Sequence, residues 1–196
     1  MRPLLVILVC SAVQVLSKES ETKAEWLEFT HEKCEKETLT SNQYKTFYEA
    51  QEFYGHDGVF EMLVRFKGIA DGHIILTTNA TSDEPRYAIS LGSYNNRYSE
   101  IRRIKPVKVE SKVSTPSIMS DLQFRGFLIT YDPHLGHVSV FGEGSDVALL
   151  HFEDTNEPLQ IRYFGFATWH NRVVQVAFNC VPKDSHSTVD VRQRGK

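Results

Sequence analysis

The sequence predicts an all-β protein, an antiparallel two-layer β-sandwich similar to a jelly roll. Between Val59 and Cys180, short runs alternate between apolar and polar residues, which is the period of a strand with one buried face. Glycine, asparagine, aspartate and proline separate these runs, and they are the residues that form tight turns. Regularly spaced strands that are too short to enclose a core singly indicate two packed sheets.

The chain begins with the features of a secretion signal. Arg2 precedes an apolar stretch from Leu4 to Val13, and the small residue Ser17 suits cleavage by signal peptidase, so residues 1–17 form the predicted signal peptide. The stretch is too short for a bilayer span, which takes about 20 residues, and no later segment approaches that length. We therefore expect a secreted, extracellular protein without a membrane span.

Secretion determines the interpretation of the cysteines. Cys10 lies in the signal, which leaves Cys34 and Cys180 in an oxidising compartment, where a disulfide between them is the natural prediction. It would close nearly the whole domain and stabilise it by about 4 to 5 kcal/mol. Two free or intermolecular thiols are the alternative. Asn79 begins an N-glycosylation acceptor between two predicted strands, so we expect a glycoprotein.

After the signal, residues 18–45 are charged and weakly patterned, and we expect an arm on the domain, with or without one short helix. Residues 46–182 form the predicted sandwich, and the polar residues 183–196 a disordered tail. The predicted strands are Phe60 to Lys67, His73 to Thr78, Arg86 to Leu91, Phe124 to Tyr131, His137 to Phe141, Ala148 to Phe152, Gln160 to Trp169 and Val173 to Cys180. Their apolar phases predict a core of Phe60, Met62, Val64, Phe66, Ile89, Leu91, Phe127, Ile129, Val138, Val140, Ile161, Tyr163, Val174, Val176 and Phe178.

Charge gives little guidance to a partner. The formal net charge is −3, so neither a nucleic acid nor an acidic membrane surface is indicated. A basic stretch stands out within this slightly acidic chain, and it either binds a sulfated or phosphorylated partner or is a solvated strand face and loop. Its members are Arg97, Arg102, Arg103, Lys105, Lys108 and Lys112.

The motifs that resemble reactive sites have simpler interpretations. Gly142-Glu143-Gly144 precedes a strand rather than the helix that a phosphate loop requires, and it predicts a hairpin turn. His134 and His137 flank a turn without a completing ligand set, so we predict no metal site. His151 and His170 could serve acid–base chemistry, but no serine or cysteine nucleophile lies nearby in the sequence.

One loop combines aromatic faces with amide and guanidinium groups beside Gly92, the ingredients of a sugar or peptide groove. An ordinary tyrosine-rich loop has the same composition. We predict that this loop faces a ligand, because loops on a rigid sheet commonly carry binding residues. The predicted ligand-binding residues are Tyr94, Asn95, Asn96, Arg97, Tyr98 and Arg102.

Four sequence blocks, in this order and spacing, resemble the farnesoic acid O-methyltransferase-type domain of arthropods, over roughly Phe47 to Phe178. The blocks are Tyr87–Gly92 leading through Asn96 and Ser99 to Ile101–Arg103, then Phe124–Ile129, Val138–Gly144 and Ile161–Trp169. The resemblance implies a β-sandwich module that occurs alone, in tandem or beside extracellular and immune-type domains. By name it also implies methylation of farnesoic acid, with S-adenosylmethionine as the methyl donor.

From these observations we expect a secreted binding or interaction module, for carbohydrate or for immune-type recognition, whose partner is a glycan or an extracellular protein. We expect no catalytic residues and no cofactor, since no recognisable S-adenosylmethionine loop or catalytic constellation is present. The alternatives are an S-adenosylmethionine-dependent farnesoic acid O-methyltransferase and a small-lipid carrier. A shallow groove of Tyr, Asn and Arg would favour the binding module, and an apolar cavity the carrier.

Overall fold

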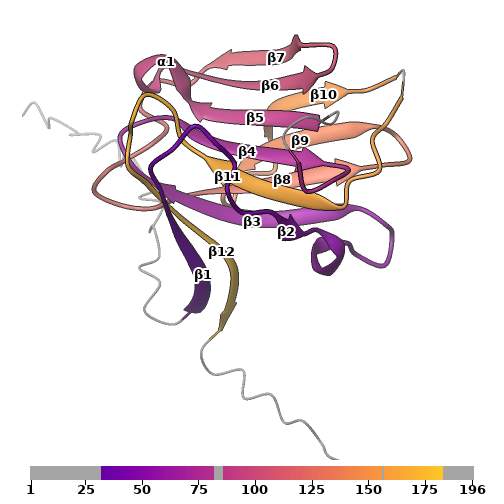
Figure 1. The fold of residues 1–196 in the computed structure, drawn as a ribbon, viewed down its shortest axis with the longest axis horizontal. Coiled ribbons are helices and arrows are strands. Elements are labelled where there is room, and N and C mark those ends of the chain that lie inside the picture. Colours follow the sequence, from indigo (N-terminus) through magenta and orange to yellow (C-terminus); the bar gives the residue numbers. More distant parts are fainter. Residues whose placement is uncertain (1–31, 82–85, 156, 183–196) are drawn as a thin grey trace, which may run out of the picture.

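The computed structural model describes residues 32–81, 86–155 and 157–182, and within these ranges the chain forms two six-stranded antiparallel sheets (Figure 1). The first sheet has the order β1 (Glu32–Leu39), β12 (Val174–Pro182), β3 (Phe60–Lys67), β8 (Arg125–Asp132), β9 (His137–Gly142) and β10 (Ala148–Glu153). The second has the order β2 (Tyr48–Glu49), β11 (Tyr163–Ala167), β4 (Gly72–Thr77), β5 (Arg86–Gly92), β6 (Tyr98–Ile104) and β7 (Lys108–Ser114). Two short helical turns are η2 (Gln51–Phe53) and α1 (Ser93–Asn96). The predicted antiparallel β-sandwich is therefore confirmed.

The core lies between the two sheets and follows the predicted period of two. In β3 every second residue from Phe60 to Phe66 is buried, and these residues face the buried alternate positions of β4, β5 and β11 across the sandwich. Aromatic rings fill one end of this space, where Phe164 lies 5.3 Å from Tyr48 and 5.8 Å from Phe178 between ring centroids. Every residue of the predicted core is buried except Tyr163.

Tyr163 is half-buried because the strand phase of β11 is the opposite of the predicted one. Ile161 is buried before the strand begins, and from Tyr163 onward Phe164 and Phe166 point into the core. The alternation therefore shifts by one residue between Ile161 and Phe164. A run with apolar residues on both phases cannot reveal such a shift from the sequence.

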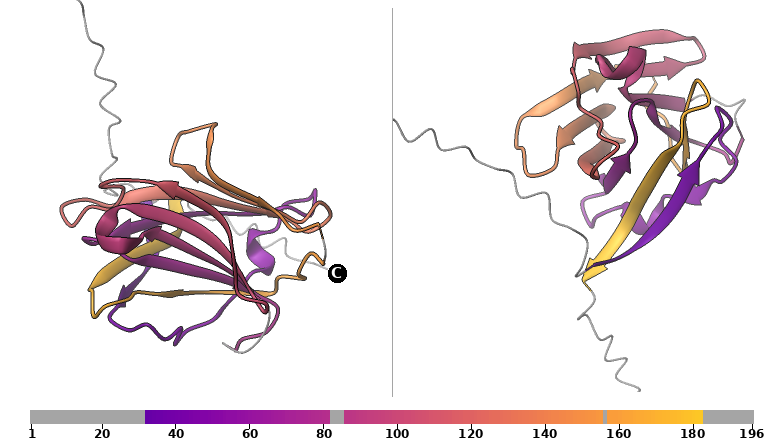
Figure 2. Two further views of the ribbon diagram at one scale, coloured as in Figure 1. Left: turned by 90° about the horizontal axis from the view of Figure 1, so that it is seen from above. Right: turned by 90° about the vertical axis from the view of Figure 1, so that its left-hand side faces the viewer.

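The described part of the expected arm contains a strand rather than a short helix. β1 pairs antiparallel with β12 from Leu39 opposite Val174 to Glu32 opposite Pro182. β1 and β12 extend together beyond the rest of the sandwich (Figures 1 and 2). The predicted disulfide links these two strands, since Cys34 and Cys180 are bonded with their Cα atoms 4.0 Å apart. The predicted signal peptide and C-terminal tail lie outside the described residues.

Most of the basic stretch lies on two strands, β6 and β7, with Arg97 and Lys105 in the adjoining turns, as a strand face and loop would have it. β6 pairs with β5 on one side and β7 on the other, so the predicted ligand loop from Tyr94 to Arg102 ends at Tyr98, where β6 begins. β6 was not among the predicted strands because polar residues occupy both of its faces. Arg102 points away from the core, while Arg103 points inward to a buried carboxylate.

That carboxylate is Asp154, which follows β10 and joins the two sheets. It is 1% exposed and accepts hydrogen bonds from the Tyr87 hydroxyl (2.8 Å) and from Arg103 Nε (2.7 Å). The Tyr87 oxygen in turn accepts the backbone N–H of Leu159, and the Tyr131 hydroxyl donates to the Leu159 carbonyl. Burial raises the pKa of Asp154, but the hydrogen bonds from Arg103 and Tyr87 outweigh it, so the net pKa lies below its ordinary value.

A second ion pair connects β3 with the β9–β10 turn. Arg65, 5% exposed, binds Glu143 through two guanidinium nitrogens and Glu32 of β1 through a third. Glu143 packs over Gly126, where a Cβ would overlap its carboxylate. The segment Gly142–Gly144 is thus the predicted hairpin turn. Among the described residues, no helix is long and apolar enough to cross a membrane.

Candidate binding site

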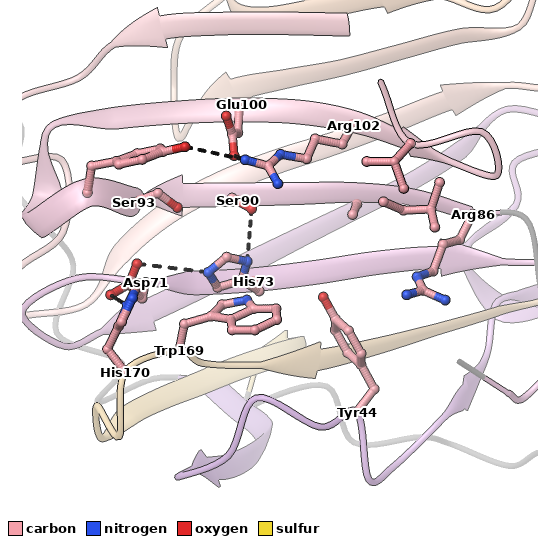
Figure 3. Close-up of a pocket in the computed structure, with 14 residues that line it drawn as sticks. Tyr44, Asp71, His73, Arg86, Ser90, Ser93, Glu100, Arg102, Trp169 and His170 are labelled. Carbon is pink, nitrogen blue, oxygen red and sulfur yellow. Dashed lines mark hydrogen bonds and ion pairs between the residues drawn. The ribbon is translucent and has the colours of Figure 1, made fainter. Parts of the chain in front are cut away.

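A pocket of about 450 Å³ lies on the outer face of the second sheet, over β4, β5 and β6 (Figure 3). Its floor consists of His73, Ala88, Ser90, Glu100 and Arg102, which alternate along the strands with residues that enter the core. Each strand gives one phase to the core and the other to the pocket, so the pocket combines polar floor residues with apolar ones such as Ala88 and Ile104.

At the centre of the floor, a histidine and a serine are hydrogen-bonded to each other. His73 Nδ1 lies 2.8 Å from Ser90 Oγ, and both residues are buried. On the other side of the ring, His73 Nε2 lies 4.0 Å from Asp71 Oδ1, which is too long for a hydrogen bond. Burial lowers the pKa of His73, with Asp71 and Glu100 opposing it, so we assign the neutral ring at physiological pH.

Asp71 lies at one end of the pocket, beside His170 and Arg172. Its carboxylate is 3.4 Å from His170 Nδ1 and 3.8 Å from Arg172 Nε. Burial raises the pKa of Asp71, but the His73 and His170 rings outweigh it and the net pKa lies below its ordinary value. This end therefore carries an ionised carboxylate whose charge is largely matched.

At the β6 side of the pocket, the buried Glu100 and Arg102 line the wall, and Lys112 lies next to Glu100 outside the lining. Glu100 is 2% exposed, and its Oε1 lies 2.5 Å from Arg102 Nη2. Its second oxygen, Oε2, is 3.9 Å from Lys112 Nζ. Arg102 Nη2 also donates to the Tyr94 hydroxyl at 3.4 Å, and Lys112 stands over the Tyr94 ring at 4.2 Å from its centroid.

Aromatic side chains form the pocket's sides. Trp169 is 39% exposed, and its ring meets the His73 ring edge-to-face at 5.6 Å between centroids. It is presented by the β11–β12 turn, where His170 and Asn171 have φ of 56° and 55° and the Arg172 N–H donates to the Trp169 carbonyl. Tyr44 lies on the same side of His73 as Trp169 (Figure 3), and burial raises the Tyr44 pKa to about 12, so its hydroxyl stays a neutral donor.

Tyr94 enters the pocket from a left-handed turn. Tyr94, Asn95 and Asn96 have φ of 55°, 60° and 61°, a conformation that costs about 1 kcal/mol or more for each non-glycine residue. The Asn96 side chain holds this turn, since it donates to the Met119 carbonyl at 2.9 Å and accepts the Met119 N–H at 3.0 Å. The strained turn is thus fixed by its surroundings.

Three polar atoms of the pocket floor lack a hydrogen bond within the described part of the chain. They are His73 Nε2, Glu100 Oε2 and Arg102 Nε, and each is inaccessible to solvent in the static structure. Buried polar groups are normally hydrogen-bonded, so such atoms commonly mark a place where a ligand or water completes the network. The pocket therefore offers acceptors and donors side by side.

The Ser90–His73 pair does not have the surroundings of a hydrolytic nucleophile. Ser90 lies in the middle of β5, opposite His73 on one side and Glu100 on the other. Backbone N–H groups there pair with neighbouring strands, whereas acyl transfer needs N–H groups directed at the developing oxyanion.

The structure brings only two of the predicted ligand-binding residues to this pocket, Tyr94 and Arg102. Asn95 accepts a hydrogen bond from Arg172, and Asn96 binds the Met119 backbone. Arg97 and Tyr98 are exposed and do not line the pocket. A ligand role for these six residues stays a prediction.

Sequence reasoning did not identify Tyr44, Asp71, His73, Ser90, Glu100 or Trp169 as site residues. A signal was present in β4 and β5, where His73 and Ser90 occupy outward positions of strands that are otherwise apolar. That signal identifies a face but not a pocket, because the register that places His73 opposite Ser90 is visible only in the sheet.

The other histidines considered in the sequence analysis lie outside the pocket. His134 is exposed in the β8–β9 turn, and His137 at the start of β9 lies 3.8 Å from Glu153. His151 binds Ser139 at 2.9 Å on the outer face of the first sheet. Among the described residues, the group with metal-ligand spacing is Glu32, Cys34 and Cys180, and both its cysteines are in the disulfide.

The glycosylation acceptor Asn79 is exposed in the segment after β4. An exposed asparagine is accessible to the enzymes that attach glycans. Its modification stays a prediction.

Fold and pocket together define a class: an antiparallel β-sandwich with a pocket of mixed polar, apolar and aromatic lining on the outer face of one sheet. A family model described as farnesoic acid O-methyl transferase matches residues 40–181. The chain belongs to this family.

Several solved β-sandwich structures are similar to this chain. A Bacillus subtilis protein of unknown function with a galectin-like fold has a TM-score of 0.48 at 10% identity, over 76% of this chain and 89% of that one. The Bacillus licheniformis β-glucanase has a TM-score of 0.43 at 10% identity, over 75% and 76% of the two chains. The basic winged bean lectin with Tn-antigen has a TM-score of 0.36 at 10% identity, over 76% and 99%. Curated proteins give no significant match.

Proposed function

We propose that this protein is a secreted glycan-binding module and that the pocket over β4, β5 and β6 holds a saccharide. The observation that carries the proposal is the floor of unsatisfied polar atoms beside the exposed ring of Trp169. A sugar ring has an apolar face that stacks on an aromatic side chain, and hydroxyl groups that both donate and accept hydrogen bonds. A glycan displayed by a cell or an extracellular protein is the partner, which suits a role in immune-type recognition.

The polar groups of the pocket match such a ligand in type. Glu100 Oε2 accepts, Arg102 Nε donates, and the neutral His73 ring offers Nε2. Each is buried without a hydrogen bond among the described residues, so a hydroxyl group reaches it only when the floor side chains shift, and the new hydrogen bond then carries little further desolvation cost on the protein side. The binding needs no cofactor.

The lipid-carrier alternative is less well supported. The facing sides of the two sheets are filled by packed rings, with Phe164, Phe166 and Phe178 within 5.0 to 5.8 Å of one another between centroids. A lipid between the sheets would have to displace this cluster.

The methyltransferase alternative follows from the family's description alone. The residues of this chain do not fit the usual platform for S-adenosylmethionine, a glycine-rich turn that leads into a helix. Here Gly142–Gly144 joins two antiparallel strands, and its Glu143 is held by Arg65. Incubation with labelled S-adenosylmethionine and farnesoic acid tests this alternative, and labelled methyl farnesoate as the product would contradict the binding-module proposal.

A glycan array tests the proposal directly. The wild type should bind a defined subset of glycans, and Trp169→Ala should lose that binding because the stacking surface is removed. Phe141→Ala is the matched control, since Phe141 is a half-buried aromatic residue of β9 in the other sheet. Equal array profiles for Trp169→Ala and wild type, or no glycan bound by the wild type, would contradict the proposal.

A further inference from the structure

Positive charges outnumber negative charges at one end of the pocket. This excess indicates which class of saccharide the pocket binds, an inference that rests on the proposed glycan binding. At the β6–β7 end, one buried carboxylate, Glu100, meets two cations, Arg102 and Lys112. Two positive charges against one negative charge leave an excess of one positive charge at this end.

The opposite end does not have this excess. Asp71 lies beside Arg172, with His170 at 3.4 Å from the carboxylate. One cation there meets one anion, and the histidine adds charge only when it is protonated. Arg86 adds a further positive charge to the pocket lining, and the Arg102 end, with Lys112 beside it, is where two cations meet a single buried carboxylate.

Arg102 is placed to bind an anion rather than only to neutralise Glu100. Its Nη2 atom contacts both Glu100 and the Tyr94 hydroxyl, and its side chain is still 34% exposed, so part of the guanidinium group is open to a ligand. A guanidinium group presents its donors as a planar fork that matches a carboxylate or sulfate in two parallel hydrogen bonds. The contacts to Glu100 and Tyr94 fix the orientation of this fork.

The anionic end and the stacking surface are far enough apart to hold different parts of one ligand. Arg102 and Trp169 lie on opposite sides of the Ser90–His73 pair (Figure 3). A sugar ring beside Trp169 can therefore span the polar floor while its acidic substituent, or that of the next residue, reaches Arg102.

We propose that the pocket binds acidic saccharides, with the carboxylate or sulfate group held by Arg102 and supported by the charge of Lys112. Glu100 opposes an incoming anion, but it is already paired with both cations, so its charge is screened at short range. Charge-assisted hydrogen bonds are about twice as strong as neutral ones, which makes the acidic group the main determinant of affinity at this end.

Three polymers with one backbone test the ligand class: dextran, carboxymethyl-dextran and dextran sulfate. Biolayer interferometry at physiological salt should give at least about tenfold tighter binding to one or both acidic forms than to dextran, a difference of about 1.4 kcal/mol. The carboxymethyl and sulfate arms distinguish the two sources of negative charge. Equal affinity for all three polymers, or binding to none, would overturn the proposal.

Arg102→Gln should remove this preference, lowering affinity for the acidic polymer about tenfold. Arg162→Gln is the matched control, because it removes one exposed positive charge outside the pocket lining and should change affinity less than about twofold. Equal losses in the two variants would indicate non-specific attraction of polyanions and would contradict a role for Arg102.

Two further measurements keep the test decisive. If Arg102→Gln lowers the melting temperature, Lys112→Gln replaces it as the test variant. Lys112 Nζ lies 3.9 Å from Glu100, and its removal should weaken acidic binding about threefold. Unchanged acidic binding by a folded Lys112→Gln and by Arg102→Gln would refute the inference. If the array instead shows a neutral glycan whose binding requires Trp169, glycan binding stands and the acidic preference fails.

Discussion

Replacement of Asp154 by alanine should destabilise the sandwich strongly, because it breaks a buried ion pair that joins the two sheets. Asp154 is 1% exposed and accepts hydrogen bonds from Tyr87 and from Arg103, whose side chain is 13% exposed. Breaking a buried pair costs about 3 to 5 kcal/mol because the remaining charge stays buried. Arg103 keeps hydrogen bonds to the carbonyls of Lys105 and Glu157, so we expect the lower end, about 3 kcal/mol.

Urea unfolding followed by tryptophan fluorescence measures this loss. Asp146→Ala is the matched control, since Asp146 is exposed in the β9–β10 turn and its replacement should cost less than about 0.5 kcal/mol. Removing both Asp154 and Arg103 should cost less than the sum of the single changes, because no buried charge is then left unpaired. Equal unfolding midpoints for the two alanine variants would refute the reasoning.

The same group makes a prediction about pH. The folded-state pKa of Asp154 is lower than its unfolded value of about 3.9, so its contribution is fully present above that value. As pH falls through the folded pKa, Asp154 becomes protonated and the contribution is lost. Wild type should therefore lose stability more steeply than Asp154→Asn below about pH 4. Parallel stability curves for the two proteins in this range would contradict the assignment.

Three other changes have defined outcomes. Phe66→Ala should lower the free energy of unfolding by about 3 to 5 kcal/mol, because Phe66 is fully buried. An unchanged melting temperature would show that Phe66 does not lie on the core side of β3. Cys34→Ser should cost up to about 5 kcal/mol, since the Cys34–Cys180 link spans 146 residues, and non-reducing peptide mapping of the wild type should recover both cysteines in one linked fragment. Asn96→Ala should cost about 1 to 3 kcal/mol, because it removes both hydrogen bonds to Met119; a urea midpoint equal to that of wild type would argue against this clamp.

The fold was predictable where each strand has one clear apolar phase. β3 and β8 alternate between buried and more exposed positions, and their core residues follow directly from the period of two. β6 was hidden because Arg103 occupies the buried phase, where its charge is matched by Asp154, a residue distant in sequence. β1 was hidden for a related reason: as an edge strand rich in Glu and Lys, it has the charged composition that discourages edge pairing.

The site was less predictable than the fold because it is formed by sheet register. The predicted loop contributes Tyr94 through a left-handed turn, and Arg102 lies on β6, but their partners come from β4, β5 and the β11–β12 turn. Asp71 and His170 are distant in sequence and meet at 3.4 Å. Pattern reasoning finds polar outward positions on single strands, and only the pairing of strands assembles them into one pocket.

The central claim is that a saccharide occupies the outer face of the second sheet. Its most direct test is a titration of ¹⁵N-labelled protein with the tightest-binding glycan from the array, followed by two-dimensional amide NMR. The account predicts that the largest chemical-shift changes lie in β4, β5, β6 and the turn that carries Trp169, and that they disappear in Trp169→Ala. Shift changes centred on the outer face of β9 and β10, around Ser139 and His151, would contradict it.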